Sequence, residues 1–187
     1  KRKGWLTAEY ALLPAATPIR TVREVSANKR NGRTIEISRL IGRALRSIAN
    51  LSVLGEDTIF IDCDVLQADG GTRTACITAA YLALKSAQQR LIHDGVIDAP
   101  ILTDEIASIS VGMGTYGPLL DMDFAEDSAI YADYNFVMSR IGKIVEIQGT
   151  AEYSPISWND FDELKNLALK GASDIFNFYD QNGYNLA

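Results

Sequence analysis

The segment from Thr58 to Leu91 constrains the fold most strongly, because a strand pattern passes through a glycine turn into a helix pattern. The strand pattern alternates Ile59, Ile61, Cys63 and Val65 with Thr58, Phe60, Asp62 and Asp64. From Ala80 to Leu91, apolar residues recur at helical spacing instead. Gly70-Gly71-Thr72-Arg73 lies between the two patterns. The segment therefore predicts a strand, a tight turn and a helix in direct succession.

This glycine turn has the residue types of an anion site. Glycine permits close backbone approach and positive φ, and a helix N-terminus attracts anions through its unpaired N–H groups and its dipole. Arg73 can add two parallel charge-assisted hydrogen bonds. A glycine pair at such a turn is also common as a plain tight connection, and this one is neither a Walker loop nor a GxGxxG dinucleotide turn. From the turn alone, a phosphate cradle and a simple connection both stay open.

Charge is distributed unevenly along the chain. Residues 1–46 carry eleven Lys and Arg against three Glu, whereas residues 47–187 carry seven Lys and Arg against twenty-one Asp and Glu. A segregated basic third is typical of a protein that binds a polyanion at one face. It is equally compatible with a basic patch of one subunit that meets an acidic patch of another. Charge alone leaves both alternatives open.

The residue inventory excludes several classes of site. His93 is the single histidine of the chain and ends a helical pattern, where a cation is favoured, so triads and histidine-rich metal sites are excluded. Cys63 and Cys76 fit neither a disulfide framework nor zinc spacing and are expected to be buried, reduced thiols. No run of about twenty apolar residues occurs, so we expect a cytoplasmic protein with no membrane partner. Acid–base chemistry then depends on carboxylates or water.

The remaining patterns predict an alternation of strands and helices. In chain order they indicate a strand at 4–10, a basic loop or arm at 20–32, a helix at 35–51, a strand from 107 to near 112–114, a strand at 119–124, an acidic connection at 125–132, and a hairpin of strands at 135–139 and 143–150. Thr34 is the expected N-cap of the helix at 35–51. Ser157 and Asp160 form the expected capping box of a final helix. Sheets covered by helices follow, without a sharp linker.

Six sequence blocks carry a more specific signal. They are Gly4–Tyr10, Gly32–Arg43, Asp62–Thr74, Glu126–Ser128, Asp133–Asn135 and Glu146–Glu152. Together, and in this order, they closely resemble the bacterial ribonuclease PH family over nearly the whole chain. The resemblance implies an α+β fold like that of ribosomal protein S5 domain 2, with mixed sheets and packed helices in two ββαβα-type halves. Family members carry a further N-terminal segment. We therefore expect a single, N-terminally truncated domain over residues 1–187, with an incomplete first half and an exposed sheet edge.

The resemblance also implies an activity. The family trims RNA, usually the 3′ tail of precursor tRNA, by phosphorolysis: inorganic phosphate attacks the terminal phosphodiester and a nucleoside diphosphate is released. Matching positions imply that Arg33, Gly71, Thr72 and Arg73 hold this phosphate. Two guanidiniums and two helix starts would then meet at one dianion, which is physically reasonable.

Acidic residues and a basic arm complete the implied site. Asp127 and Asp133 match the two aspartates that the family needs, either to hold Mg²⁺ or to protonate the leaving 3′-oxygen. Without the resemblance, a cap or turn role for Asp127 is favoured. Arg20 and Arg23 fit the family's RNA-binding arm, whereas Ala15 replaces its third arginine, so we expect weaker binding of structured tRNA. The implied assembly is a homo-oligomer, a hexameric ring of dimers.

Two other functions remain as alternatives to the enzyme. One is a non-catalytic ring subunit that binds RNA, and the other is an inactive truncated fragment of this family. Non-catalytic relatives typically lose the phosphate arginines or the acidic pair. Because Arg33, Arg73, Asp127 and Asp133 are all present, the sequence favours the enzyme.

Overall fold

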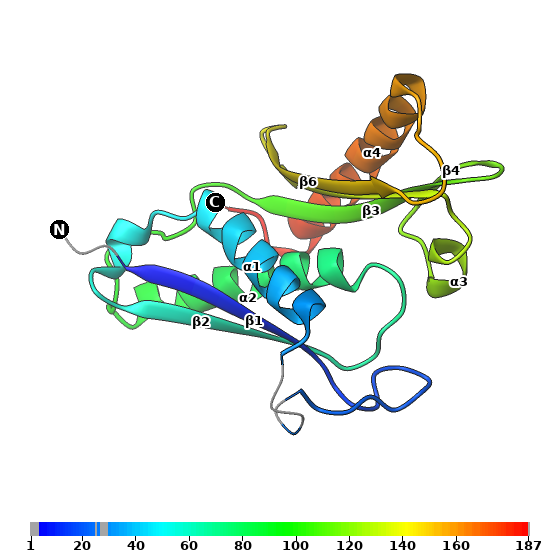
Figure 1. Cartoon of the computed structure of the whole chain (residues 1–187). Helices are drawn as coiled ribbons and strands as arrows, with labels where there is room; N and C mark the ends of the chain where they lie inside the picture. The colour runs from blue at the N-terminus through cyan, green and yellow to red at the C-terminus, as the bar shows by residue number, and fades with distance from the viewer. Residues whose placement is uncertain (1–3, 25, 27–29, 187) are drawn as a thin grey trace. The chain divides into compact units, whose positions relative to one another are not determined.

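A computed structural model describes residues 4–24, 26 and 30–186 of the chain (Figure 1). The chain folds as two compact units, one of residues 1–68 and 79–104 and the other of residues 69–78 and 105–187. Helix α2 (Thr72–His93) contributes its first two turns to the second unit and the remainder to the first. Among the described helices, none is both long enough and apolar enough to cross a bilayer.

The first unit is built on a short parallel sheet. Strands β1 (Trp5–Leu12) and β2 (Thr58–Val65) pair in register from Trp5 opposite Thr58 to Leu12 opposite Val65. Helix α1 (Gly32–Ser47) packs on β1 with its apolar stripe, and the Ser38 hydroxyl accepts a hydrogen bond from the Tyr10 N–H at 3.0 Å. A 3₁₀ turn, η1 (Leu51–Leu54), follows α1. The predicted strand–helix order of this unit is confirmed.

An antiparallel sheet of order β4-β3-β5-β6 organises the second unit. Its strands are β3 (Ile106–Gly114), β4 (Gly117–Leu120), β5 (Ala132–Ser139) and β6 (Ile144–Ala151), and they are followed by helix α4 (Trp158–Asn182). The apolar face of the sheet packs against α4 through a buried cluster of Ala107, Ile109, Val111, Phe136, Leu164 and Ala168. The predicted hairpin of residues 135–150 and the Ser157–Asp160 capping box are both confirmed.

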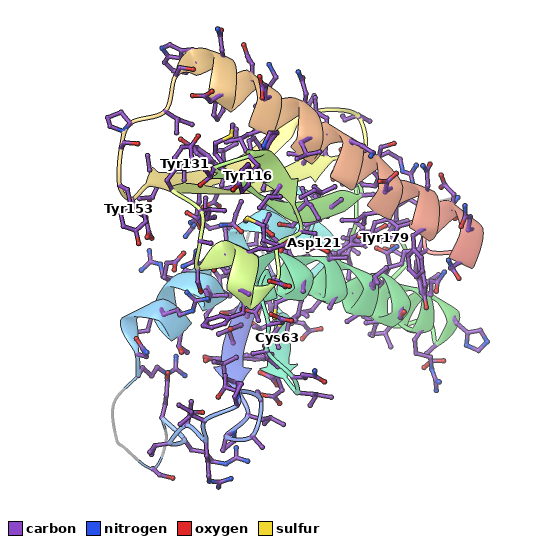
Figure 2. The ribbon with its side chains drawn as sticks, turned by 90° about the vertical axis from the view of Figure 1, so that its right-hand side faces the viewer. Cys63, Tyr116, Asp121, Tyr131, Tyr153 and Tyr179 are labelled. Carbon is purple, nitrogen blue, oxygen red and sulfur yellow. The ribbon has the colours of Figure 1, made fainter. Side chains whose placement is uncertain are left out.

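An ion-pair network that is only partly buried fastens the last helix to this sheet. Arg140, which follows β5, lies 2.5 Å from Glu105 and 2.9 Å from Asp180 on α4. The Tyr179 hydroxyl on α4 donates to the Ile106 carbonyl at 3.0 Å, and its burial raises the pKa of the phenol (Figure 2). These contacts hold α4 over the apolar face of the sheet. The opposite face is therefore left for the start of α2.

That opposite face is polar. In an antiparallel sheet, directly opposed residues point to the same side, and alternate residues of one strand share a face. Ser110 is opposite Asn135, and Gly112 is opposite Asp133. Their strand neighbours two positions away include Ser108. The side of β3 and β5 that faces away from α4 therefore carries hydroxyl, amide and carboxylate groups.

Three expectations about local structure are wrong. Helix α1 begins at Gly32 with Asn31 as its N-cap, not at Ile35 with Thr34, because the polar first turn carries no buried apolar residue to mark it. The strand expected at 119–124 ends at Leu120: Asp121 has φ +52°, and Phe124 begins helix α3 (Phe124–Asp127) inside the expected acidic connection. Cys63 is half-buried, whereas Cys76 is buried as expected. The basic arm at 20–32 lies partly outside the described residues.

Candidate functional site

The glycine turn opens α2 as the sequence predicts. Gly71 has φ +69°, a left-handed conformation that glycine adopts without strain. Its carbonyl accepts hydrogen bonds from the Thr74 hydroxyl at 2.8 Å and from the Ala75 N–H at 3.0 Å. The first turn of α2 contains no acidic residue, and Thr72 and Arg73 are half-buried there. The N-terminal dipole of this 22-residue helix is thus available to an anion.

The polar face of the sheet lies directly against this turn. A Cβ atom on Gly71 would come within 3.5 Å of three oxygens, which belong to Thr74, Ser110 and Asp121. The Ser108 N–H donates to the Thr78 hydroxyl two turns further along α2 at 3.4 Å. Asp121 donates its N–H to the Ser110 carbonyl at 2.9 Å and is exposed (Figure 2). The turn is therefore surrounded by oxygen atoms from three segments.

Met122 occupies the space between the turn and the sheet. A Cβ atom on Gly70 would lie 1.9 Å from the Met122 carbonyl oxygen, and one on Gly112 would lie 2.3 Å from the Met122 sulfur. Glycine is therefore required at both positions because a Cβ atom would clash with Met122. Neither position has the positive φ that would favour glycine for its conformation. Met122 itself is 3% exposed. Its two neighbours, Asp121 and Asp123, are exposed beside the glycine turn.

Helix α3 carries the first predicted acid. Asp123 caps this single turn: its carboxylate accepts from the Glu126 N–H at 2.8 Å, and the Glu126 side chain accepts from the Asp123 N–H at 3.1 Å. Asp127 is the last residue of α3 and is exposed. The Phe124 N–H at the first position of α3 donates to the Asp69 carboxylate at 2.6 Å. Because Asp69 directly precedes the glycine turn, α3 is tied to that turn.

Asp133, the second predicted acid, lies in the middle of the same unit. It is half-buried on β5, opposite Gly112 of β3 and Thr150 of β6. Its side chain therefore points to the polar face that also carries Ser110. Within the described part of the chain, no three His, Cys, Asp or Glu side chains are grouped as a metal site. Two carboxylates are still compatible with Mg²⁺, which usually takes one or two from the protein and the rest from waters and substrate phosphates.

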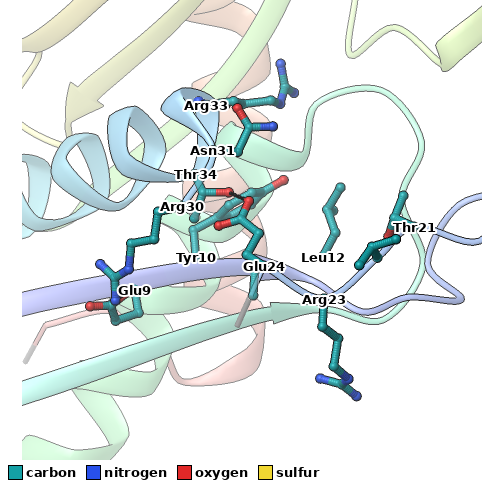
Figure 3. A pocket seen from close by; sticks show the side chains of 12 residues that line it. Glu9, Tyr10, Leu12, Thr21, Arg23, Glu24, Arg30, Asn31, Arg33 and Thr34 are labelled. Carbon is teal, nitrogen blue, oxygen red and sulfur yellow. Dashed lines mark hydrogen bonds and ion pairs between the residues drawn. The ribbon is translucent and has the colours of Figure 1, made fainter. Parts of the chain in front are cut away.

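The first unit carries the other basic residues of the predicted site, Arg20, Arg23 and Arg33. Arg33 lies in the first turn of α1, where its N–H donates to the Asn31 side chain at 3.1 Å, and its own side chain is exposed. A pocket of about 540 Å³ lies beside it, and Figure 3 shows Arg33 and Arg23 at opposite ends of this pocket. Arg30, which also lines the pocket, pairs with Glu9 at 2.8 Å. Arg20 is exposed on the preceding loop.

The predicted site residues thus fall into two groups. Arg20, Arg23 and Arg33 belong to the first unit, whereas Gly71, Thr72, Arg73, Asp127 and Asp133 belong to the second. The second unit carries the anion turn near Ser110 of its sheet, Asp133 on the polar face of that sheet, and Asp127 at the end of α3, which Asp69 ties to the turn. Convergence of the two groups on one phosphate stays a prediction.

Sequence reasoning missed Asp69, Ser110 and Asp121. For Asp69 a signal existed, since an aspartate before a glycine pair commonly accepts hydrogen bonds from nearby backbone N–H groups.

Substitutions of Ser108 and Ser110 test the hydrogen bonds assigned to the polar face of the sheet. Ser108 donates its hydroxyl to the Phe136 carbonyl at 3.1 Å, whereas the buried Ser110 hydroxyl has no hydrogen-bond partner among the described residues. We expect Ser108→Ala to lower the free energy of unfolding by about 1 kcal/mol, the usual net contribution of one hydrogen bond. Ser110→Ala should be close to neutral. Urea denaturation of the two variants checks this, and an equal loss in both would contradict the assigned hydrogen bonds.

The sequence of the chain is similar to those of known proteins. Residues 1–89 match the RNase PH family, described as the 3′ exoribonuclease family, domain 1. Ribonuclease PH of Neisseria gonorrhoeae is 49% identical over 187 residues, which are all of this chain and 77% of that protein. Ribonuclease PH of Bacillus velezensis is 55% identical over 174 residues, which are 92% of this chain and 71% of that protein.

Solved structures show the same fold at low sequence identity. The crystal structure of rice Rrp46 matches with a TM-score of 0.72 and 18% identity, over 96% of this chain and 73% of that one. The Archaeoglobus fulgidus exosome with RNA bound to the active site matches with a TM-score of 0.76 and 20% identity, over 95% of this chain and 71% of that one.

The fold and the sequence relatives together define an α+β enzyme of the class that shortens RNA from its 3′ end. The chain belongs to the ribonuclease PH family. This membership confirms the predicted fold, like that of ribosomal protein S5 domain 2, and the predicted phosphorolytic exoribonuclease activity.

Proposed function

We propose that the chain removes 3′-terminal nucleotides from precursor tRNA, in the 3′-to-5′ direction, with inorganic phosphate as co-substrate. A phosphate oxygen attacks the terminal phosphodiester, the bond to the 3′-oxygen of the preceding nucleotide breaks, and a nucleoside diphosphate leaves. The freed 3′-oxygen takes up a proton. The observation that carries this proposal is that one compact unit holds the anion turn, Asp133 on the polar sheet face, and Asp127 at the end of helix α3, whose first N–H is hydrogen-bonded to Asp69 just before the turn.

In this proposal the phosphate is held at the start of α2. Gly71 and Thr72 present backbone N–H groups and a hydroxyl, and Arg73 supplies a guanidinium. Arg33, at the start of α1, is the proposed second guanidinium. Its exposure and its place in a first helical turn without acidic residues support that role.

We propose that Asp127 and Asp133 hold Mg²⁺ and that one of them supplies the proton to the leaving 3′-oxygen. Mg²⁺ would neutralise charge on the phosphoryl oxygens when bound. The exposure of Asp127 and the half-buried position of Asp133 leave carboxylate oxygens accessible to substrate. Asp133 is held more rigidly, since it lies inside a central strand.

The basic residues of the first unit are proposed to guide RNA. Arg20 and Arg23 are exposed cations, and the pocket beside Arg33 has room for a nucleotide. We further propose that residues 1–187 act as one domain in a hexameric ring of dimers in the cytoplasm, where precursor tRNA is trimmed. The similarity to an exosome with RNA bound to its active site supports RNA binding.

Substitution of Arg73 tests the phosphate site. We expect Arg73→Ala to raise the KM for phosphate about 10- to 100-fold, because a charge-assisted hydrogen bond contributes about 1.5–3 kcal/mol. The measurement is the rate of nucleoside diphosphate release from a 3′-tailed tRNA at varied phosphate concentration. Arg90→Ala is the matched control, since Arg90 lies at the other end of α2 and pairs with Asp94 at 2.5 Å. Equal KM values in the two variants would exclude Arg73 from the phosphate site.

A further inference from the structure

One oxygen of Asp69 links two segments that are 55 residues apart in the sequence. The Asp69 Oδ1 atom accepts the Gly70 N–H at 2.9 Å and the Phe124 N–H at 2.6 Å. The first bond lies in the anion turn, and the second lies at the first residue of α3. Both bonds lie within the second compact unit.

Helix α3 depends on such external contacts. It has four residues, and an isolated helix of one turn is unstable because nucleation fixes several dihedral angles for one hydrogen bond. The first N–H groups of any helix also need partners from outside its own ladder. Asp123 satisfies the Glu126 N–H, and Asp69 satisfies the Phe124 N–H. The direction of α3, and with it the position of Asp127, is therefore set partly by Asp69.

We propose that Asp69 is a positioning residue that holds the anion turn and the acidic helix α3 in a fixed relation. Through one shared acceptor atom, the backbone that binds phosphate and the helix that ends in Asp127 keep their separation. This inference rests on the proposed function, because it matters only if both segments act on one substrate. Asp69 need not touch the phosphate or the RNA for this role.

The carboxylate charge of Asp69 gives a competing explanation. Asp69 is exposed and lies near the helix N-terminus that would bind the dianion, so its charge opposes anion binding. If charge were its main effect, Asp69→Asn and Asp69→Ala would both lower the KM for phosphate. If Asp69 acts mainly as a hydrogen-bond acceptor, Asp69→Asn should behave like the parent protein, because the Asn oxygen still accepts from the Gly70 and Phe124 N–H groups. Asp69→Ala loses both hydrogen bonds. The two explanations therefore predict different results for the same pair of variants.

For the acceptor role we expect Asp69→Ala to lower kcat about 10- to 100-fold and to raise the KM for phosphate as well. Losses of this size are usual when a supporting hydrogen bond is removed from a functional group. Asp69→Asn should stay within a few-fold of the parent protein. Ser157→Ala is the control, since it removes a helix cap from α4, far along the chain from the anion turn. It should lower the melting temperature and leave kcat and KM unchanged.

The same hydrogen bond can be removed from its donor side. Phe124 is the first residue of α3, a position where proline is well tolerated, and Asp123 has the extended backbone that a following proline requires (φ −72°, ψ 175°). Phe124→Pro deletes the N–H that Asp69 accepts. Phe124→Ala keeps the N–H and removes only a ring that is 70% exposed. We expect Phe124→Pro to reproduce the kcat loss of Asp69→Ala, and Phe124→Ala to be close to the parent protein.

The double variant completes the test, and Phe124→Pro alone keeps the inference testable if Asp69→Ala folds poorly. Because Asp69→Ala already removes the bond that Phe124→Pro removes, the double variant should lose little more activity than Asp69→Ala alone, whereas independent effects would multiply. Multiplying losses, a normal kcat in Phe124→Pro, or equal damage in Asp69→Asn and Asp69→Ala would each overturn the inference. Failure of the proposed function is seen separately, as an absence of phosphate-dependent diphosphate release by the parent protein.

Discussion

Asp133→Asn should reduce kcat for phosphorolysis about 1,000-fold while leaving RNA affinity within a few-fold of the parent protein. Asn has the shape of Asp but neither its charge nor its capacity to lose or gain a proton, and acid catalysis alone contributes about 10²- to 10⁴-fold. Asp133 lies within β5 between Gly112 and Thr150, so an isosteric change there should not disturb the sheet. Diphosphate release and RNA binding by fluorescence anisotropy are the two measurements.

The same variant separates the two roles proposed for the carboxylate. If Asp133 holds Mg²⁺, the magnesium concentration for half-maximal residual activity should rise strongly in Asp133→Asn. If it donates the proton, that concentration should be unchanged while kcat remains low. Asp162→Asn is the control: Asp162 is exposed on α4 and pairs with Lys165 three residues on. Undiminished turnover in Asp133→Asn would exclude both roles.

Periodicity predicted the regular elements well because apolar residues recur in the sequence with the period of a strand or of a helix. Strands β3, β5 and β6 and helices α1, α2 and α4 were all expected from such patterns, to within a few residues at their ends. The region after β4 was predicted wrongly, since Leu120, Met122 and Phe124 continue an alternation that reads as a strand. In the structure Met122 is buried while Phe124 is exposed, because Asp121 turns the backbone and a capping box starts α3.

The sequence predicted only part of the candidate site, because some of its residues act through contacts with distant segments. Arg33, Arg73, Asp127 and Asp133 belong to recognisable blocks, and their types suit an anion and a divalent cation. Asp69 and Ser110 act through contacts with segments far away in the sequence, which no local pattern encodes. Ser110 in particular occupies a strand position that reads simply as the polar side of an alternating strand.

Gly70 and Gly71 illustrate two different demands on adjacent residues. Gly71 has φ +69°, yet a Cβ atom there would meet its nearest neighbours at ordinary van der Waals distances of 3.4–3.5 Å. Gly70 shows no such positive φ, but a Cβ atom there would lie 1.9 Å from the backbone oxygen of Met122. Backbone atoms cannot rotate away as a flexible side chain can. Substitution of Gly70 must therefore move the anion turn or the segment that leads into α3.

Accordingly, Gly70→Ala should be the more damaging change at this turn. We expect a loss of about 2–3 kcal/mol in the free energy of unfolding from overpacking, together with a fall in kcat/KM for phosphate beyond about 100-fold, since displacements near 1 Å have that effect on catalysis. Gly71→Ala should lose about 1–2 kcal/mol from its left-handed backbone alone. Gly114→Ala, on β3 of the same unit, is the control, because its Cβ atom would make only ordinary contacts from 3.5 Å outward.

Denaturation and phosphorolysis rates for these three glycine variants distinguish a spatial requirement from a conformational one. A Gly70→Ala protein with the stability and activity of Gly114→Ala would mean that Met122 is not held against the turn. The link between the anion turn and α3 would then be looser than the Asp69 hydrogen bonds imply. If instead Gly70→Ala loses activity in excess of its loss of stability, close packing of Met122 on the turn is a requirement of the reaction itself. That result is expected, because Met122 and Asp69 both join the turn to the segment that carries Asp127.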